Sequence, residues 1–195
     1  MAEVSVLYFD VGGAENTDAT LKAAGKRAAE LGIRQLVVAS NTGNTALRAA
    51  EIVPDMERIV AVTLQAGLWE VYSPPNPEVV SKAEARGVRF LTCTHSLMGA
   101  VASAIHRQFG GLPSEELIAR TYYTFSQGTK VAIECMMMAA DAGLLDMSQD
   151  VISVAGTHEG ADTALVVRPT FTHNFFSCRV REILAMPRTD APEPE

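Results

Sequence analysis

Short apolar segments alternate with helical patterns over the first half of the chain. Apolar runs of strand length cover residues 4–9, 36–39, 58–63 and 88–92. Segments with helical spacing separate them, at about residues 17–31, 45–52 and 77–86, and Gly32 and Gly87 mark helix ends. Strands that alternate with helices at this pace are typical of βαβ units. We therefore predict an α/β fold with three layers, in which helices flank a mostly parallel sheet.

The second half of the chain begins with helical patterns and ends with strands. Helices are predicted over 96–109, from Ser114, which we expect to cap its helix, and over 128–142. Two strands follow at 150–155 and 163–169, joined by a loop over 156–162. No linker is apparent, so residues 1–187 are predicted to form one domain. The polar, proline-containing residues 188–195 are predicted to be a disordered tail.

Composition narrows the classes of partner. The 195 residues carry a net charge of −7, which is the wrong sign for a broad field that grips nucleic acid or an anionic membrane. The apolar runs are too short to span a bilayer, and no signal peptide is apparent. Three widely spaced cysteines indicate reduced thiols. We therefore expect a cytoplasmic protein that binds neither nucleic acid nor membranes.

A polar loop joins the second predicted strand to its helix and has the residue types of a phosphate cradle. The loop and the start of the helix contain Ser40, Thr42, Gly43, Asn44 and Thr45. A helix N-terminus leaves backbone N–H groups unsatisfied and carries partial positive charge, so it binds an anion without a lysine. Glycine permits close approach, and the hydroxyls can donate to phosphate oxygens. The same residues also suit an ordinary turn and N-cap, and this alternative stays open.

Missing motifs restrict the ligand. The Walker spacing with its lysine is absent, and no GxGxxG follows a strand. A ligand with one terminal phosphate is therefore favoured over a dinucleotide. The four histidines form no zinc signature, and we predict no metal site.

The helix predicted from residue 128 is apolar except for a narrow polar arc. At about 100° per residue, Gln127, Lys130, Glu134 and Asp141 fall within an arc of about 60°. If this helix is buried, Lys130 and Glu134 must pair with each other or with groups in a cleft, because an unpaired buried charge is costly. The alternative is a thin exposed stripe with a surface ion pair. We list both residues as candidates for the ligand site.

Further candidates follow the predicted strands at the carboxyl edge, where ligands of open α/β sheets bind. Gln65 follows the strand at 58–63, and His95 follows the strand at 88–92. Trp69 suits either a stacking contact with a ring or an anchor for its own loop. The apolar segment 171–176 either covers the core or forms a homodimer contact.

Four segments in this order resemble a known family. They are SNTGNTA from Ser40, THSLMG from Thr94, QGTKVAIECMMMAADAGLL from Gln127 and GTHEGADTALVV from Gly156. Together they resemble the carboxy-terminal α/β domain of pyruvate kinase, and more closely the stand-alone microbial proteins that are similar to that domain. The resemblance covers nearly the whole chain except the tail.

The resemblance implies a binding role. In pyruvate kinase the domain is regulatory, and the loop that matches residues 40–45 holds a phosphate of the sugar bisphosphate effector. The catalytic barrel of that enzyme has no counterpart here, so the resemblance argues against pyruvate kinase activity. The stand-alone relatives resemble binders of flavin mononucleotide (FMN), which has a single terminal phosphate.

The chain departs from the kinase pattern in the loop after Gly156. Effector binding in the kinase uses basic residues for a second phosphate, whereas this loop has Thr157, His158, Glu159, Asp162 and Thr163. Acidic groups repel a bisphosphate but accept hydrogen bonds from ribose or ribityl hydroxyls. The alternative is a simple turn between strands.

The sequence therefore predicts a small phosphorylated ligand, with FMN as the specific candidate. It leaves open whether the protein is a flavin-dependent enzyme, a regulatory module that senses a sugar phosphate, or a structural subunit of an oligomer.

Overall fold

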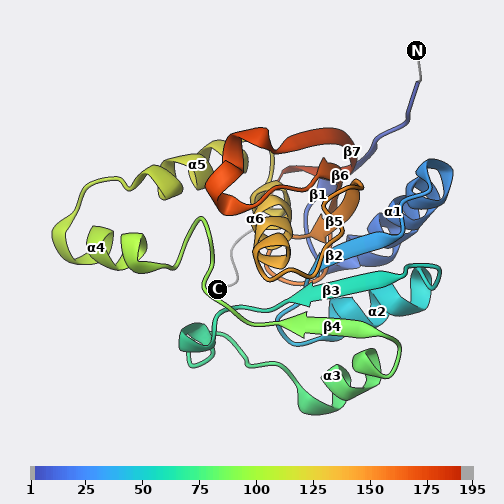
Figure 1. The fold of residues 1–195 in the computed structure, drawn as a ribbon, viewed down its shortest axis with the longest axis horizontal. Helices are drawn as coiled ribbons and strands as arrows, with labels where there is room; N and C mark the ends of the chain where they lie inside the picture. The colour runs from blue at the N-terminus through green and yellow to red at the C-terminus, as the bar shows by residue number, and fades with distance from the viewer. Residues whose placement is uncertain (1–2, 190–195) are drawn as a thin grey trace.

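The computed structural model describes residues 3–189 and contains a seven-stranded sheet in the order β1-β7-β6-β5-β2-β3-β4 (Figure 1). The strands are β1 (Leu7–Val11), β2 (Gln35–Ala39), β3 (Arg58–Val62), β4 (Val88–Leu91), β5 (Val151–Ala155), β6 (Thr163–Arg168) and β7 (Arg179–Thr189). Only β6 runs antiparallel to its neighbours among these strands. The predicted α/β class with a mostly parallel sheet is confirmed.

Six α-helices and three short 3₁₀ helices connect the described strands. The α-helices are α1 (Thr17–Leu31), α2 (Asn44–Ile52), α3 (Pro77–Glu84), α4 (Val101–Phe109), α5 (Ser114–Tyr123) and α6 (Gln127–Asp141). The 3₁₀ helices are η1 (Ala14–Asn16), η2 (Ala66–Leu68) and η3 (Thr172–Ser177). No helix within residues 3–189 is long and apolar enough to cross a membrane.

Two hydrophobic cores lie on opposite faces of the sheet. Leu36 and Val38 of β2 belong to the core that α1, α2 and α3 cover. Val37 belongs to the second core, which α5 and α6 cover. Side chains of a strand alternate between faces, and both faces are covered here, which explains why β2 is apolar throughout. The fold thus has the three predicted layers.

Two predicted helix starts are wrong. The helix expected over 96–109 begins only at Val101, because the backbone N–H groups of Leu97 and Met98 donate to the Glu134 carboxylate and leave the chain irregular. Ser114 does not cap α5. Pro113 occupies the cap position, and the Ser114 hydroxyl donates to the side chain of Glu115.

The sequence pattern missed β7 and misplaced the tail. β7 pairs in parallel with β1 and antiparallel with β6, and much of its first half is exposed. Its mixed polar pattern and Pro187 do not indicate a strand, because proline cannot donate to a strand ladder. Arg188 and Thr189, which were expected in the tail, belong to this strand. The remaining tail residues, 190–195, lie outside the described residues.

An arginine on α1 fixes that helix to β7. The guanidinium of Arg27 donates two hydrogen bonds of 2.7 Å to the carboxylate of Glu182 and a third to Glu30. A bidentate pair of this kind is geometrically specific. The Arg27 guanidinium lowers the pKa of Glu182 below its ordinary value.

This pair makes stability depend on pH. A carboxylate with a lowered pKa contributes stability above its unfolded pKa and loses it as pH falls through its folded pKa. We expect Glu182→Gln to lower the free energy of unfolding at pH 7, and the difference from the parent to shrink as pH falls below the usual carboxyl range. Urea unfolding at pH 7 and pH 3.5 measures this. A difference that stayed the same at both pH values would contradict it.

Candidate functional site

The carboxyl ends of the parallel strands bring the predicted loops to one edge of the sheet. Val38 of β2 pairs with Val154 of β5, so the chain leaves these neighbouring strands side by side at Ser40 and Gly156. Neighbouring strands lie about 5 Å apart. The cradle and the loop over 156–162 therefore begin next to each other, as the fold class predicts.

The cradle has the local geometry of an anion-binding helix start. Gly43 caps α2 with a φ of 99°, a conformation that favours glycine, and a β-carbon there would lie 3.1 Å from Val79 Cγ1. Ser40 Oγ accepts a hydrogen bond of 3.1 Å from the Ala46 N–H. Within residues 3–189, no protein acceptor is recorded for the N–H groups of Gly43, Asn44 and Thr45. These three donors remain available to a ligand or to water.

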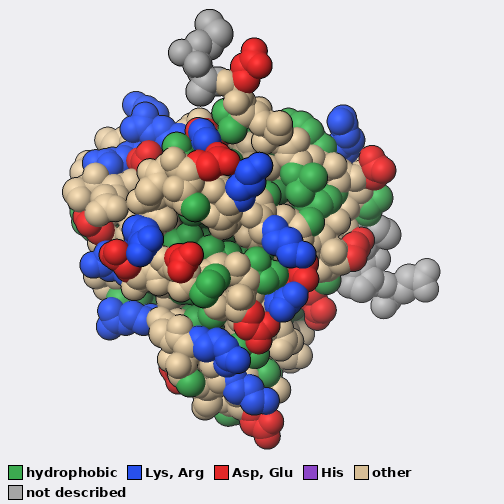
Figure 2. Space-filling model, turned by 90° about the vertical axis from the view of Figure 1, so that its right-hand side faces the viewer, with side chains coloured by type: hydrophobic (Ala, Val, Ile, Leu, Met, Phe, Trp, Pro, Cys, Tyr) green, Lys and Arg blue, Asp and Glu red, His purple; other side chains and the backbone are tan. Residues whose placement is uncertain are grey.

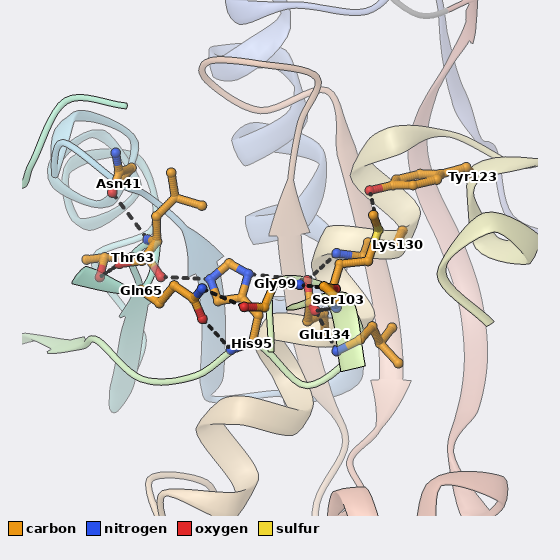
Figure 3. Close-up of polar contacts among 12 residues, drawn as sticks. Asn41, Thr63, Gln65, His95, Gly99, Ser103, Tyr123, Lys130 and Glu134 are labelled. Atoms are coloured by element: carbon orange, nitrogen blue, oxygen red, sulfur yellow. Dashed lines mark hydrogen bonds and ion pairs between the residues drawn. The ribbon is translucent and has the colours of Figure 1, made fainter. Parts of the chain in front are cut away.

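Two neighbouring segments hold the cradle in place. Asn41 Oδ1 accepts a hydrogen bond of 3.2 Å from the Leu64 N–H in the loop after β3 (Figure 3). The Thr42 carbonyl accepts a bond of 3.0 Å from the N–H of Asn76, whose side chain caps α3. The cradle is thus fixed by contacts with the loops around it.

Asp162 is a buried acceptor inside the chain. Its side chain is fully buried, and the carboxylate accepts hydrogen bonds from the Gly13 N–H at 3.0 Å, the Thr157 N–H at 2.9 Å and the Thr163 hydroxyl at 2.8 Å. These bonds satisfy a carboxylate that would otherwise be costly to bury. The sequence placed Asp162, Thr157 and Thr163 in the ligand site, and the structure joins them in this internal network. Glu159 is the exposed acidic residue of the loop.

The tip of this loop is strained and is braced by α1. His158 is exposed and has a φ of 60°, and it is the one non-glycine residue with a positive φ in the described part of the chain. Such backbone strain tends to cluster at functional sites. Gly160 packs against Ala14, and the Ala161 N–H donates to Thr17 Oγ1 at 3.0 Å. The loop therefore leans toward the same face of the sheet as α1 and α2.

Lys130 and Glu134 form a buried ion pair on α6. Their side chains are 5% and 2% exposed, so the alternative of a thin exposed stripe is wrong for these two positions. Lys130 Nζ donates to Glu134 Oε2, and Glu134 Oε1 accepts from the N–H groups of Leu97 at 2.7 Å and Met98 at 3.0 Å (Figure 3). Asp141, at the end of the same arc, is exposed and accepts hydrogen bonds from Thr172. Glu134 thereby fastens the segment that leads into α4.

His95 and Gln65 lie beside this pair. His95 Nδ1 is 3.7 Å from Glu134 Oε2, and its Nε2 is 3.4 Å from the Thr63 carbonyl oxygen. Gln65 Nε2 donates to the Gly99 carbonyl at 2.7 Å, and its Oε1 accepts a long hydrogen bond from the His95 N–H. The predicted residues Gln65, His95, Lys130 and Glu134 thus form one cluster, which we call the α6 cluster.

The structure separates the α6 cluster from the cradle. Both lie at the carboxyl edge, but α2 covers one face of the sheet and α6 covers the other. Asn41 and the loop after β3 link the two groups (Figure 3). Trp69 belongs to that loop, and its indole N–H donates to the Leu64 carbonyl at 3.0 Å. Trp69 therefore anchors its own loop, which was one of the two alternatives.

Sequence reasoning missed several groups that shape the edge. Asn41 is part of the polar loop, but nothing in its residue type distinguishes a tether from a turn residue. The donors of Gly13, Leu97 and Met98 are backbone N–H groups, which leave no signal in side-chain patterns. Thr157 Oγ1 is buried without a hydrogen-bond partner in the described structure.

Other features give no second site at this edge. The three cysteines are free thiols, and burial raises the pKa of each thiol. No group of three metal-ligating side chains occurs among residues 3–189. A shallow depression lined by Asp150, Arg168 and Arg181 lies at the opposite edge of the sheet, remote from the cradle.

The order of elements and the position of the polar loops define an open α/β domain, a fold class in which ligands bind at the carboxyl ends of the parallel strands. A family model described as "Pyruvate kinase, alpha/beta domain" matches residues 18–167. The chain therefore belongs to the pyruvate kinase α/β domain family, and the resemblance seen in the sequence is confirmed. The matched range includes the cradle, the α6 cluster and the loop over 156–162.

The contacts of the α6 cluster predict that Glu134→Leu and Lys130→Met lower stability by different amounts. Glu134→Leu leaves the Lys130 charge and two backbone N–H groups without their acceptor, so we expect a loss of about 3–5 kcal/mol. Lys130→Met should cost less, because Glu134 keeps the N–H groups of Leu97 and Met98. Urea unfolding of both variants measures the difference.

Arg34→Met provides the control, because it breaks an exposed ion pair in which Arg34 Nε lies 3.5 Å from Glu57 Oε1. Such pairs contribute little to stability. Equal losses for Glu134→Leu and Lys130→Met would show that the backbone contacts of Glu134 are unimportant.

Proposed function

We propose that the protein binds a small ligand with one terminal phosphate at the N-terminus of α2, and that FMN is the specific ligand. Phosphate oxygens would accept hydrogen bonds from the N–H groups of Gly43, Asn44 and Thr45. The hydroxyls of Ser40, Thr42 and Thr45 would supply further donors. Bound FMN would supply reversible redox chemistry.

The proposal rests on one observation: some backbone N–H groups at the carboxyl edge donate to carboxylates of the chain, and others have no acceptor within the described residues. The N–H groups of Gly13 and Thr157 donate to a carboxylate of the chain itself, that of Asp162. Those of Leu97 and Met98 donate to the carboxylate of Glu134. In both places an anionic oxygen satisfies a pair of neighbouring donors.

The start of α2 has the same kind of donors, and the chain provides no carboxylate for them in the described structure. Its N-cap is Gly43, which has no side chain; the side chains of Asn76 and Ser126 cap α3 and α6, whereas α1, α4 and α5 also begin without a side-chain cap. The positive end of the helix dipole adds to the attraction of an anion. An external phosphate would satisfy the donors of α2 as carboxylates satisfy the other two groups.

The neighbouring loop supports a monophosphate with hydroxyl groups. Glu159 and His158 are exposed in the loop that begins beside Ser40. A carboxylate accepts hydrogen bonds from ribityl hydroxyls but repels a second phosphate. The resemblance of the sequence to stand-alone proteins similar to this domain also favours FMN, because those proteins resemble FMN binders.

The remaining predicted residues fit a supporting role. Gln65, His95, Lys130 and Glu134 bond mainly to one another and to loop backbone. Asp162 and Thr163 are likewise bonded within the chain. We assign these residues to holding the loops of the carboxyl edge in position.

Family membership also favours a second candidate function, a regulatory module that senses a sugar phosphate, as the domain does in pyruvate kinase. The same cradle would serve that role. The visible absorption spectrum of the purified protein distinguishes the two, because bound FMN absorbs visible light and a sugar phosphate does not. Loss of that absorbance on adding reduced nicotinamide cofactors would favour a flavin-dependent enzyme.

Replacing Asn44 with proline tests the backbone donors directly. Proline removes the Asn44 N–H, which makes no intrahelical bond at the first position of the helix, but its ring crowds the preceding Gly43, whose ψ is −16°. Melting curves of the variant and the parent are therefore compared before binding is measured. We expect Asn44→Pro to weaken FMN binding by about tenfold or more, as for the loss of a hydrogen bond to a charged group. Isothermal titration calorimetry gives the affinity.

Asn44→Ala is the matched control, because it keeps the N–H and removes only an exposed side chain. Its affinity should stay within about threefold of the parent. Equal affinities of the proline variant and the parent, with melting curves showing both folded, would place the phosphate elsewhere.

The acidic loop over 156–162 predicts which of two phosphorylated ligands binds more tightly. We expect FMN to bind more tightly than fructose 1,6-bisphosphate, because Glu159 repels a second phosphate. Glu159→Lys should narrow this preference by about tenfold, mainly by improving bisphosphate binding. Competition titrations of the parent and the variant measure both. Tighter binding of the bisphosphate by the parent would favour the regulatory alternative.

A further inference from the structure

Helix α4 has an unusual orientation on the surface of the protein. Figure 1 shows α4 and α5 extending from one end of the molecule, on the side away from α1. Val101, Ile105 and Phe109 recur every four residues and so form one stripe on α4. These side chains are 74%, 52% and 76% exposed. The apolar stripe of this helix therefore faces outward.

Of the four polar residues of α4, Ser103 and His106 lie against neighbouring loop residues, whereas Arg107 and Gln108 are exposed. Ser103 and His106 are partly buried, Ser103 Oγ accepts a hydrogen bond of 2.9 Å from the Gly99 N–H, and the His106 ring contacts the Gly111 carbonyl. An amphipathic helix of a monomeric protein normally buries its apolar stripe. A nine-residue helix is also marginal in water without packing on its apolar side. The stripe therefore needs a partner.

Further exposed apolar side chains occur in the segment that follows α4. Leu112, Leu117 and Phe125, in and around α5, are each more than half exposed. We call these three residues and the α4 stripe the arm surface. If each of the six side chains offers roughly 100 Å², together they offer about 600 Å², or about three quarters of the about 800 Å² that one partner contributes to a standard interface.

The charge of the arm points to the kind of partner. The segment over 97–125, which contains the whole arm surface, has two arginines, two glutamates and one histidine, so its formal net charge is zero in a chain of net charge −7. By contrast, basic and acidic side chains are interspersed over the face seen in Figure 2, which is the right-hand side of Figure 1. Two acidic chains repel least when they meet through such a weakly charged, apolar surface.

A membrane fits the arm less well. Helices that lie in a membrane interface usually have several Lys or Arg residues on their polar face. The only such residue on α4 is Arg107. We propose that the arm surface is the interface of a homodimer, with α4 of one copy packed against the arm of the second copy. This inference is independent of the ligand that the cradle binds.

Two aspartate substitutions at equally exposed valines test the proposal. Val101 lies in the arm surface at 74% exposure, and Val71 lies outside it at 75%. Aspartate at Val101 suits the first turn of a helix, so α4 itself should persist. We expect the parent to sediment as a dimer at about 50 µM, Val101→Asp to raise the dimer dissociation constant by at least about thirtyfold, and Val71→Asp to leave it unchanged.

Ile105→Asp, in the middle of the stripe, should act like Val101→Asp, and circular dichroism checks that each variant is folded. A monomeric parent at 50 µM would overturn the proposal. A dimer that survived both arm substitutions would place the interface elsewhere and overturn it too. Co-sedimentation of the parent with phosphatidylcholine–phosphatidylserine vesicles, lost in Val101→Asp, would replace the second copy with a membrane.

Discussion

Backbone N–H groups that end up at the carboxyl edge of the sheet need acceptors, and this requirement organises the whole edge. The chain meets it twice with buried carboxylates, at Asp162 for the loop after β1 and at Glu134 for the segment before α4. Each carboxylate joins segments that are distant in sequence. The donors at the start of α2 are treated differently, because the described chain offers them no acceptor. The proposed phosphate site follows from that difference.

The same carboxylates connect the site to the rest of the fold. Glu134 reaches from the core helix α6 to the base of α4, and Gln65 holds the opposite side of that base through the Gly99 carbonyl. Asn41 then ties the loop that carries Gln65 to the cradle. A chain of direct contacts therefore runs from the proposed ligand site to the arm surface.

The sequence predicted most of the framework and only part of the site. Apolar periodicity and glycine positions located β2, β3, β4 and α1, because both are strong local signals. β7 was missed, because its exposed polar residues and Pro187 give a sequence pattern typical of a loop. Its pairing with β1 and β6 is visible only in the structure. The pairing of Lys130 with Glu134 followed from their helical spacing, but the partners of Glu134 are backbone N–H groups, which side-chain patterns do not reveal. The internal role of Asp162 was hidden for the same reason.

The most direct test of the phosphate site observes its donors. In a titration of the ¹⁵N-labelled protein with FMN, followed by heteronuclear NMR, the amide resonances of Gly43, Asn44 and Thr45 should shift strongly and saturate together. Inorganic phosphate should move the same three resonances at higher concentration, because it offers the same oxygens without the rest of the ligand. If FMN bound while these three amides stayed in place, or if neither compound moved them, the account of α2 as the phosphate site would be wrong.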